Sequence, residues 1–247
     1  TLNDGTSRLS ITSRAPGRHA FRHLLPTPNE GVGLYERDRW EPGKRQERTI
    51  TFTRTNGPGQ PMTFDLSWAG NDHGAFSAPL SVTLPLGRPA PVTVAVEPPG
   101  FGVFTAHLTL SHPDVPGYAY RTTATVVAPE PLNAANQYRI KKETKVPRPG
   151  MESFFFQVPE GASALKVELG WTDRQVSLTV VRPDTRQHRG DAVLTEAKGV
   201  VHVVWNPMPG MWEVRLTDIA DTQTFDWQQA KKAEPVPPTP ATLTVSA

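Results

Sequence analysis

Residues 102–112 read Gly-Val-Phe-Thr-Ala-His-Leu-Thr-Leu-Ser-His, and this stretch indicates the fold class. Its alternate residues Phe104, Ala106, Leu108 and Leu110 are apolar, which places four apolar side chains on one face of a β-strand. Proline and glycine flank the stretch on both sides, as they do at turns. A strand with one apolar face, bounded by turns, is typical of an antiparallel sandwich.

The same alternation recurs through the first half of the chain. Turn-forming segments rich in Gly, Pro, Asn and Asp separate the runs. The expected strands are 47–55, 62–68, 90–99, 102–112 and 120–130. Their order resembles that of the last strands of an immunoglobulin-like or fibronectin-like sandwich.

A second set of strands follows a short proline-containing segment, Ala128–Gln137. The prolines at 129 and 131 limit the backbone there, so we expect a domain boundary near 131–135, with domains 1–132 and 133–247. A series of strands that ends with a late returning one favours a jelly roll for the second domain. The expected strands are 136–146, 151–161, 164–171, 175–184, 199–210, 211–219 and a last one, after a proline-rich connection, at 241–247. The predicted fold is therefore all-β, with two tandem antiparallel β-sandwiches.

Composition excludes several classes of function. The chain has 247 residues and no cysteine, so disulfides, thiol catalysis and cysteine-bound zinc are ruled out. The 26 prolines disfavour long helices, and no apolar run is long enough for a membrane-spanning helix. The aromatic residues among the first 54 residues are not interleaved with the basic excess in a nucleic-acid-binding pattern, so we expect no nucleic-acid binding.

Several segments resemble a known family. Pro209-Gly210-Met211-Trp212-Glu213-Val214-Arg215-Leu216 is similar to the proline-glycine and aromatic-strand motif of jelly-roll modules that follow the catalytic domain in many secreted bacterial peptidases. Residues 31–38 (GVGLYERD) and 145–162 (KVPRPGMESFFFQVPEGA) resemble the region after the catalytic domain of tripeptidyl-peptidase II-type subtilases.

The resemblance implies a non-catalytic C-terminal region of a subtilisin-like serine peptidase, secreted or in the cell envelope. It would brace the catalytic domain of the same polypeptide, mediate assembly or contact substrate protein. In such peptidases the segment around Leu34 leads out of the catalytic domain. We therefore expect Val32, Leu34 and Tyr35 to be partly covered by that domain, or otherwise by self-association.

Gly5-Thr6-Ser7 matches the start of the subtilase nucleophile motif, but Leu9 and Ile11 stand where alanine and proline are expected. Ser7 is therefore not predicted to be a nucleophile, and we expect no catalytic residue in this chain. His19 and His23 have the i, i+4 spacing of a zinc helix, yet prolines bracket them. Asp173 stands alone where related jelly rolls bind calcium, so we expect neither a metal nor a cofactor.

An alternative function is a tandem carbohydrate- or cell-surface-binding module that uses exposed aromatic residues. Trp68 and Trp212 fall in phase with apolar neighbours, which predicts core positions. Trp40 and Trp227 lie outside such runs and are, with Tyr35, the candidate contact residues. A stand-alone glycosidase would need two carboxylates about 5–10 Å apart. Glu36, Asp38, Asp65 and Glu168 are available, but sequence alone does not pair them.

Overall fold

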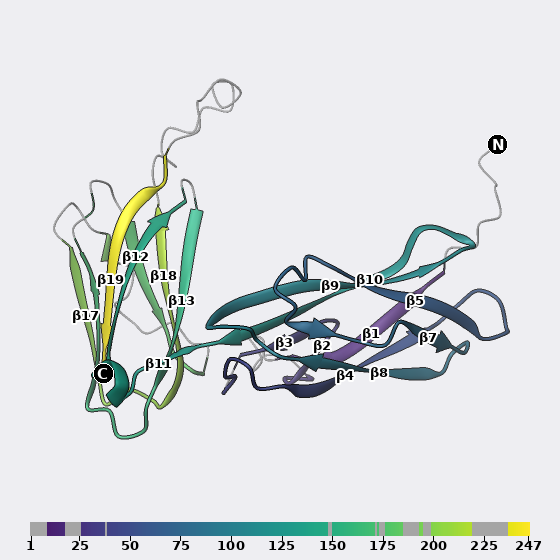
Figure 1. Ribbon diagram of the computed structural model, residues 1–247, viewed down its shortest axis with the longest axis horizontal. Helices are drawn as coiled ribbons and strands as arrows, with labels where there is room; N and C mark the ends of the chain where they lie inside the picture. The colour runs from purple at the N-terminus through teal and green to yellow at the C-terminus, as the bar shows by residue number, and fades with distance from the viewer. Residues whose placement is uncertain are drawn as a thin grey trace. The chain divides into compact units, whose positions relative to one another are not determined.

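The structure is a computed structural model, and it describes residues 9–17, 26–37, 39–147, 150–170, 172, 176–184, 193–194, 199–218 and 237–247. The described residues form β-strands and one three-residue 3-10 helix, η2 (Ala134–Asn136), and no α-helix occurs among them. The chain divides into two units, Thr1–Ala128 and Pro129–Ala247 (Figure 1). The predicted all-β fold with tandem sandwiches is confirmed.

The first unit contains two five-stranded sheets. One has the order β2-β1-β4-β8-β6, and its strands are β1 (Ile11–Pro16), β2 (Glu30–Gly31), β4 (Gln46–Arg54), β6 (Phe76–Ser77) and β8 (Pro89–Val96). The other has the order β3-β10-β9-β5-β7, and its strands are β3 (Leu34–Glu36), β5 (Met62–Ala69), β7 (Ser81–Leu84), β9 (Gly102–His112) and β10 (Val115–Ala128). Neighbouring strands are antiparallel except for β3, which runs parallel to β10 with Leu34 opposite Ala124. The prediction of purely antiparallel pairing missed this strand.

The alternation in β9 sets the core of the first unit. Ala106, Leu108 and Leu110 are at most 1% exposed and belong to one apolar cluster with Ile50 and Phe52 of β4, while Phe104 packs at its margin. Full burial of one such side chain contributes about 1.5–3 kcal/mol. The apolar face predicted from residues 102–112 is therefore the face that joins the two sheets.

The second unit also has two sheets. One has the order β12-β19-β14-β17, from β12 (Arg139–Val146), β14 (Ala164–Leu169), β17 (Val200–Trp205) and β19 (Thr239–Ser246). The other has the order β11-β13-β18-β15-β16, from β11 (Glu130–Pro131), β13 (Gly150–Val158), β15 (Val176–Val181), β16 (Val193–Leu194) and β18 (Gly210–Asp218). From β12 to β15 each successive strand lies in the opposite sheet, and the returning strand β19 pairs with both β12 and β14. The crossings between the two sheets make the second unit a β-sandwich.

Trp212 anchors the core of the second unit. Its ring is 1% exposed, and its indole Nε1 donates a hydrogen bond to the Met208 carbonyl at 2.8 Å. Gly210 has φ +128°, a conformation that side-chain-bearing residues rarely adopt, and a Cβ there would lie 3.1 Å from Pro183. The proline-glycine-aromatic motif is therefore a structural device: the glycine allows the turn, and the aromatic ring fills the core.

The division between the units falls after Ala128, whereas the sequence placed it after residue 132. Glu130 and Pro131 pair with Phe156 and Gln157 of β13. Leu132 is 1% exposed and packs in the second core. These three residues therefore belong to the second unit.

None of the helical residues that the structure describes forms a segment with the length and apolarity needed to span a membrane.

Candidate interaction surfaces

Several residues weighed as candidate sites lie outside the described residues. They are Ser7, His19, His23, Asp38, Asp173 and Trp227. Within the described ranges no group of three or more His, Cys, Asp or Glu side chains is placed to hold a metal ion. No further structural statement applies to those six positions.

The three described carboxylates that were considered for a glycosidase pair have different surroundings. Glu36 is buried and bound by Arg48 in the first unit. Glu168 is in the second unit, where its Oε1 lies 2.7 Å from Lys166 Nζ. Asp65 is exposed on β5. Each group therefore has a separate local environment.

A hydroxyl–imidazole contact lies on the outer face of the first unit. His107 Nδ1 and Thr123 Oγ1 are 3.1 Å apart on neighbouring strands. The next pair along the same two strands, Thr105 and Thr125, has its hydroxyls 3.0 Å apart. This repetition identifies a ladder of cross-strand pairs, which stabilise sheets.

Trp40 does not present its ring to solvent. It is 2% exposed, its Nε1 donates to Glu36 Oε2 at 3.3 Å, and the Arg48 guanidinium lies 4.9 Å from its ring centre. Arg48 also donates from Nε to Glu36 Oε1 at 2.9 Å. The prediction that Trp40 faces outward is therefore wrong, because an ion pair distant in sequence covers it.

The segment around Gly33 is fixed to the first unit. The Val32 carbonyl accepts hydrogen bonds from the hydroxyls of Ser13 and Thr122, the latter at 2.6 Å. A Cβ at Gly33 would lie 2.5 Å from the Thr123 carbonyl oxygen, so glycine permits this close approach. Leu34 then enters the core at 1% exposure.

The exposures of this segment correct one expectation. Leu34 is covered by its own unit and needs no further domain, so the prediction for Leu34 is wrong. Val32 is 72% exposed, and Tyr35 is half-buried on β3, where it pairs with Thr125. Val32 and Tyr35 are the residues of this segment that keep accessible surface.

Arg37 follows β3 and is 3% exposed, yet its Nε and Nη2 atoms have no hydrogen-bond partner among the residues that the structure describes. An unsatisfied buried donor costs about 1–3 kcal/mol, and more when it is charged. Glu36 and Arg37 therefore differ in their environment: the carboxylate is fully engaged, and the guanidinium is not.

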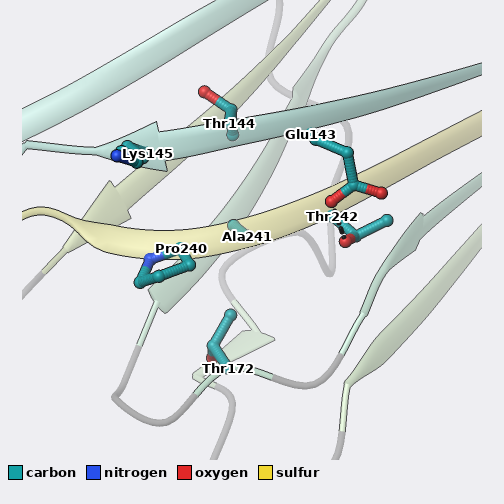
Figure 2. Close-up of a pocket in the computed structure, with 7 residues that line it drawn as sticks. All are labelled: Glu143, Thr144, Lys145, Thr172, Pro240, Ala241 and Thr242. Carbon is teal, nitrogen blue, oxygen red and sulfur yellow. Dashed lines mark hydrogen bonds between the residues drawn. The ribbon is translucent and has the colours of Figure 1, made fainter.

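The second unit has a cavity of about 770 Å³ beside β12 and β19. Figure 2 shows Thr144 on β12 and Thr172 beside β19. The lining residues are Glu143, Thr144, Lys145, Thr172, Pro240, Ala241 and Thr242. Glu143 accepts a hydrogen bond from Thr242 Oγ1 at 2.7 Å and lies 2.6 Å from Lys141 Nζ. The hydrogen bonds from Lys141 and then Thr242 lower the pKa of Glu143. These contacts therefore keep the carboxylate charged to a lower pH than an isolated glutamate.

Trp205 is the exposed tryptophan that the sequence did not single out. It ends β17 and is 74% exposed, and Val201 on the same strand is 59% exposed. Apolar residues occupy both faces of this strand, because Val200 and Val204 are buried. Alternation therefore could not show which face was outside.

These geometries define a protein of two β-sandwiches, the first of the immunoglobulin-like class. Residues 12–128 match the family model described as the Ig-like domain in actinomycete serine proteases. This match covers the first unit from residue 12 to its last residue. A search of curated proteins finds no match to the chain.

The chain matches a number of solved structures. A crystal structure of tripeptidyl peptidase 2 (TPP II) matches with a TM-score of 0.66 and 12% identity, over 97% of this chain and 20% of that one. The chain thus spans one fifth of that peptidase's length, and the likeness shows a shared fold. The secreted serine protease VesC from Vibrio cholerae matches with a TM-score of 0.37 and 10% identity, over 87% of this chain and 50% of that one. The first match and the family model agree with the resemblance to post-catalytic β-sandwiches of a peptidase.

Proposed function

We propose that the chain is a non-catalytic region of a subtilisin-like serine peptidase, secreted or in the cell envelope. Its role is to brace the catalytic domain, to mediate assembly or to contact substrate protein. The observation that carries the proposal is the match of residues 12–128 to an Ig-like domain of serine proteases. The shared fold with one fifth of tripeptidyl peptidase 2 supports it.

A bracing role needs a rigid start to the first sandwich. The Val32 carbonyl is held by two hydroxyls, Leu34 is buried, and Glu36 is bound by Arg48 and Trp40. This segment is therefore held rigidly to the first sandwich, so a domain connected through it would have a fixed attachment point. Val32 and Tyr35 supply the accessible surface that a neighbouring domain would cover.

The test is deletion of the 247 residues from the full-length polypeptide. The proposal expects the shortened peptidase to lose activity faster on heating, or to lose its assembly state, while the reaction with a small ester substrate is retained. A deletion that changes neither heat inactivation, assembly nor protein-substrate cleavage would contradict it. An upstream reading frame without Asp, His and Ser subtilase motifs would also contradict it.

The alternative function, a carbohydrate-binding module, loses one of its candidate residues because Trp40 is buried. Trp205 has the exposure that such a platform needs. However, its neighbours on the outer face are the valines of β17, and sugar binding also requires convergent polar groups. The observations at Trp205 favour a ligand other than a sugar.

A further inference from the structure

Strand β17 forms one edge of its sheet, next to β14 and beyond β19 and β12 (Figure 1). The register fixes which backbone groups face that edge. The N–H of Gly170, the residue after β14, donates to the Thr242 carbonyl at 2.8 Å. Backbone groups alternate in direction along a strand, so Lys166 and Glu168 also bond to β19. The residues between them on β14 bond to β17. The Asn206 N–H donates to the Ser163 carbonyl at 2.9 Å, which gives the same phase.

The phase leaves three residues of β17 with their backbone groups directed away from β14. They are Val201, Val203 and Trp205, since Val200, His202 and Val204 lie in the hydrogen-bonded pairs. In the part of the chain that the structure describes, no strand pairs with this outer side. The edge therefore offers N–H and C=O groups spaced as a template for another strand.

The same three residues direct their side chains to the outer face of the sheet. Trp205 is 74% exposed, Val201 is 59% exposed, and Val203 is half-buried. Natural edge strands are usually protected by lysine, proline or a bulge. Strand β17 contains neither lysine nor proline, and its pairing with β14 has a continuous register. Strand β17 is therefore an unprotected edge strand with an apolar outer face.

The charges beside this edge cancel. Lys166 and Glu168 lie opposite Val203 and Val201 on β14, and they pair with each other at 2.7 Å. The surface next to the three residues is therefore neutral overall. A ligand is selected by its strand geometry and its apolar side chains, and charge contributes little.

The size of the patch decides between a second copy and a smaller ligand. A fully covered tryptophan contributes about 150–250 Å², and two valines add less. A stable protein interface buries about 800 Å² on each partner. The patch is well below that area, so it suits a weak, short-lived ligand better than a stable dimer.

We propose that β17 binds an extended, unfolded polypeptide segment as an added strand, with alternate apolar side chains against Val201, Val203 and Trp205. This inference rests on the proposed function, because an unfolded chain is what a peptidase receives as substrate. It names the substrate-contact role and assigns it to one edge of the second unit. Main-chain hydrogen bonds provide the affinity, and the side-chain stripe provides the preference.

The test uses a fluorescein-labelled peptide of alternating valine and threonine with lysines at both ends, titrated with the full 247-residue chain. We expect a dissociation constant of about 100 μM, as befits a small interface. Two further peptides carry N-methyl groups on the valines or on the threonines. In an antiparallel added strand, like the strands already in this sheet, a residue whose side chain lies against Val201, Val203 or Trp205 also directs its N–H toward β17. Methylation of the valines removes these donors, so affinity should fall at least about tenfold. Methylation of the threonines should leave it within about twofold.

Two protein variants complete the test. Trp205→Ala should weaken binding about tenfold, whereas Leu80→Ala, which alters an 85% exposed residue of the first unit, should not change it. Equal binding of both methylated peptides, or no binding by any, would overturn the inference. So would retention of the chain on cellulose or chitin that Trp205→Ala abolishes, or dimerisation in sedimentation that the same substitution abolishes. Such a failure leaves the proposed function standing, because that depends on the deletion experiment.

Discussion

Arg54 carries a charge into the core of the first unit at 0% exposure. Its guanidinium donates to four main-chain carbonyls, those of Leu84, Asn56, Pro58 and Gln60, at 2.7–3.2 Å. Three of these carbonyls belong to the turn that follows β4. The side chain therefore closes that turn and ties it to the end of β7.

Replacing Arg54 with methionine should destabilise the first unit by about 3 kcal/mol, since four main-chain carbonyls lose the donor that closes the turn. Arg14→Met is the matched control, because Arg14 is 64% exposed and its ion pair with Glu30 contributes about 0–1 kcal/mol. Urea unfolding followed by tryptophan fluorescence measures both free energies. Equal stability of the two variants would show that the turn does not depend on Arg54.

The burial of some residues could be predicted from the sequence, and the burial of others could not. Ala106, Leu108, Leu110 and Trp212 were correctly placed in the core because they alternate in phase with other apolar residues. Trp40 was misplaced because its burial depends on Glu36 and Arg48, and a salt bridge across 12 residues leaves no local periodic signal. Arg54 was missed for the same reason: a lone arginine in a strand looks like a solvent-facing residue until its turn is folded.

At the scale of elements, strong antiparallel strands were predictable and short edge strands were not. Strand β9 has eleven residues of alternation, whereas β3 has three residues and pairs in parallel with β10. A parallel partner distant in the chain leaves no turn signal between the two strands. The close approach at Gly33 is what allows β3 to reach β10.

Gly33→Ala should detach β3 from β10. The new Cβ would meet the Thr123 carbonyl at 2.5 Å, and Thr123 is held in the middle of a sheet, so we expect a loss of about 1–3 kcal/mol. Hydrogen exchange of the amides of residues 34–36 should become faster. Gly59→Ala is the control, since a Cβ there meets nothing within 4 Å and Gly59 does not have a positive φ. Unchanged exchange in Gly33→Ala would contradict the assigned contact.

At the scale of the whole molecule, each unit has its own two sheets and its own apolar cluster. The clusters contain no residue in common. The sequence anticipated two sandwiches because the turn and strand pattern begins again after the prolines at 129 and 131. It placed the boundary a few residues late because Leu132 gives no sign of which core it enters.

Residues 1–128 and 129–247, produced separately, should each fold. The physical reason is that, among the described strands, each takes its sheet partners from its own unit. Circular dichroism should show β-structure in both fragments, and each should unfold cooperatively in urea. A fragment that stays unfolded alone would contradict the division into independent domains.

We infer that this chain serves a serine peptidase without containing its nucleophile. The most direct measurement is labelling of the full-length polypeptide with a fluorophosphonate, followed by mapping of the modified serine, with the 247-residue chain labelled in parallel. A reactive serine needs an adjacent general base and an oxyanion pocket. The account predicts that the full-length polypeptide is labelled at a serine outside these 247 residues and that the chain alone is not labelled. Label on any serine within residues 1–247, or an unreactive full-length polypeptide, would contradict it.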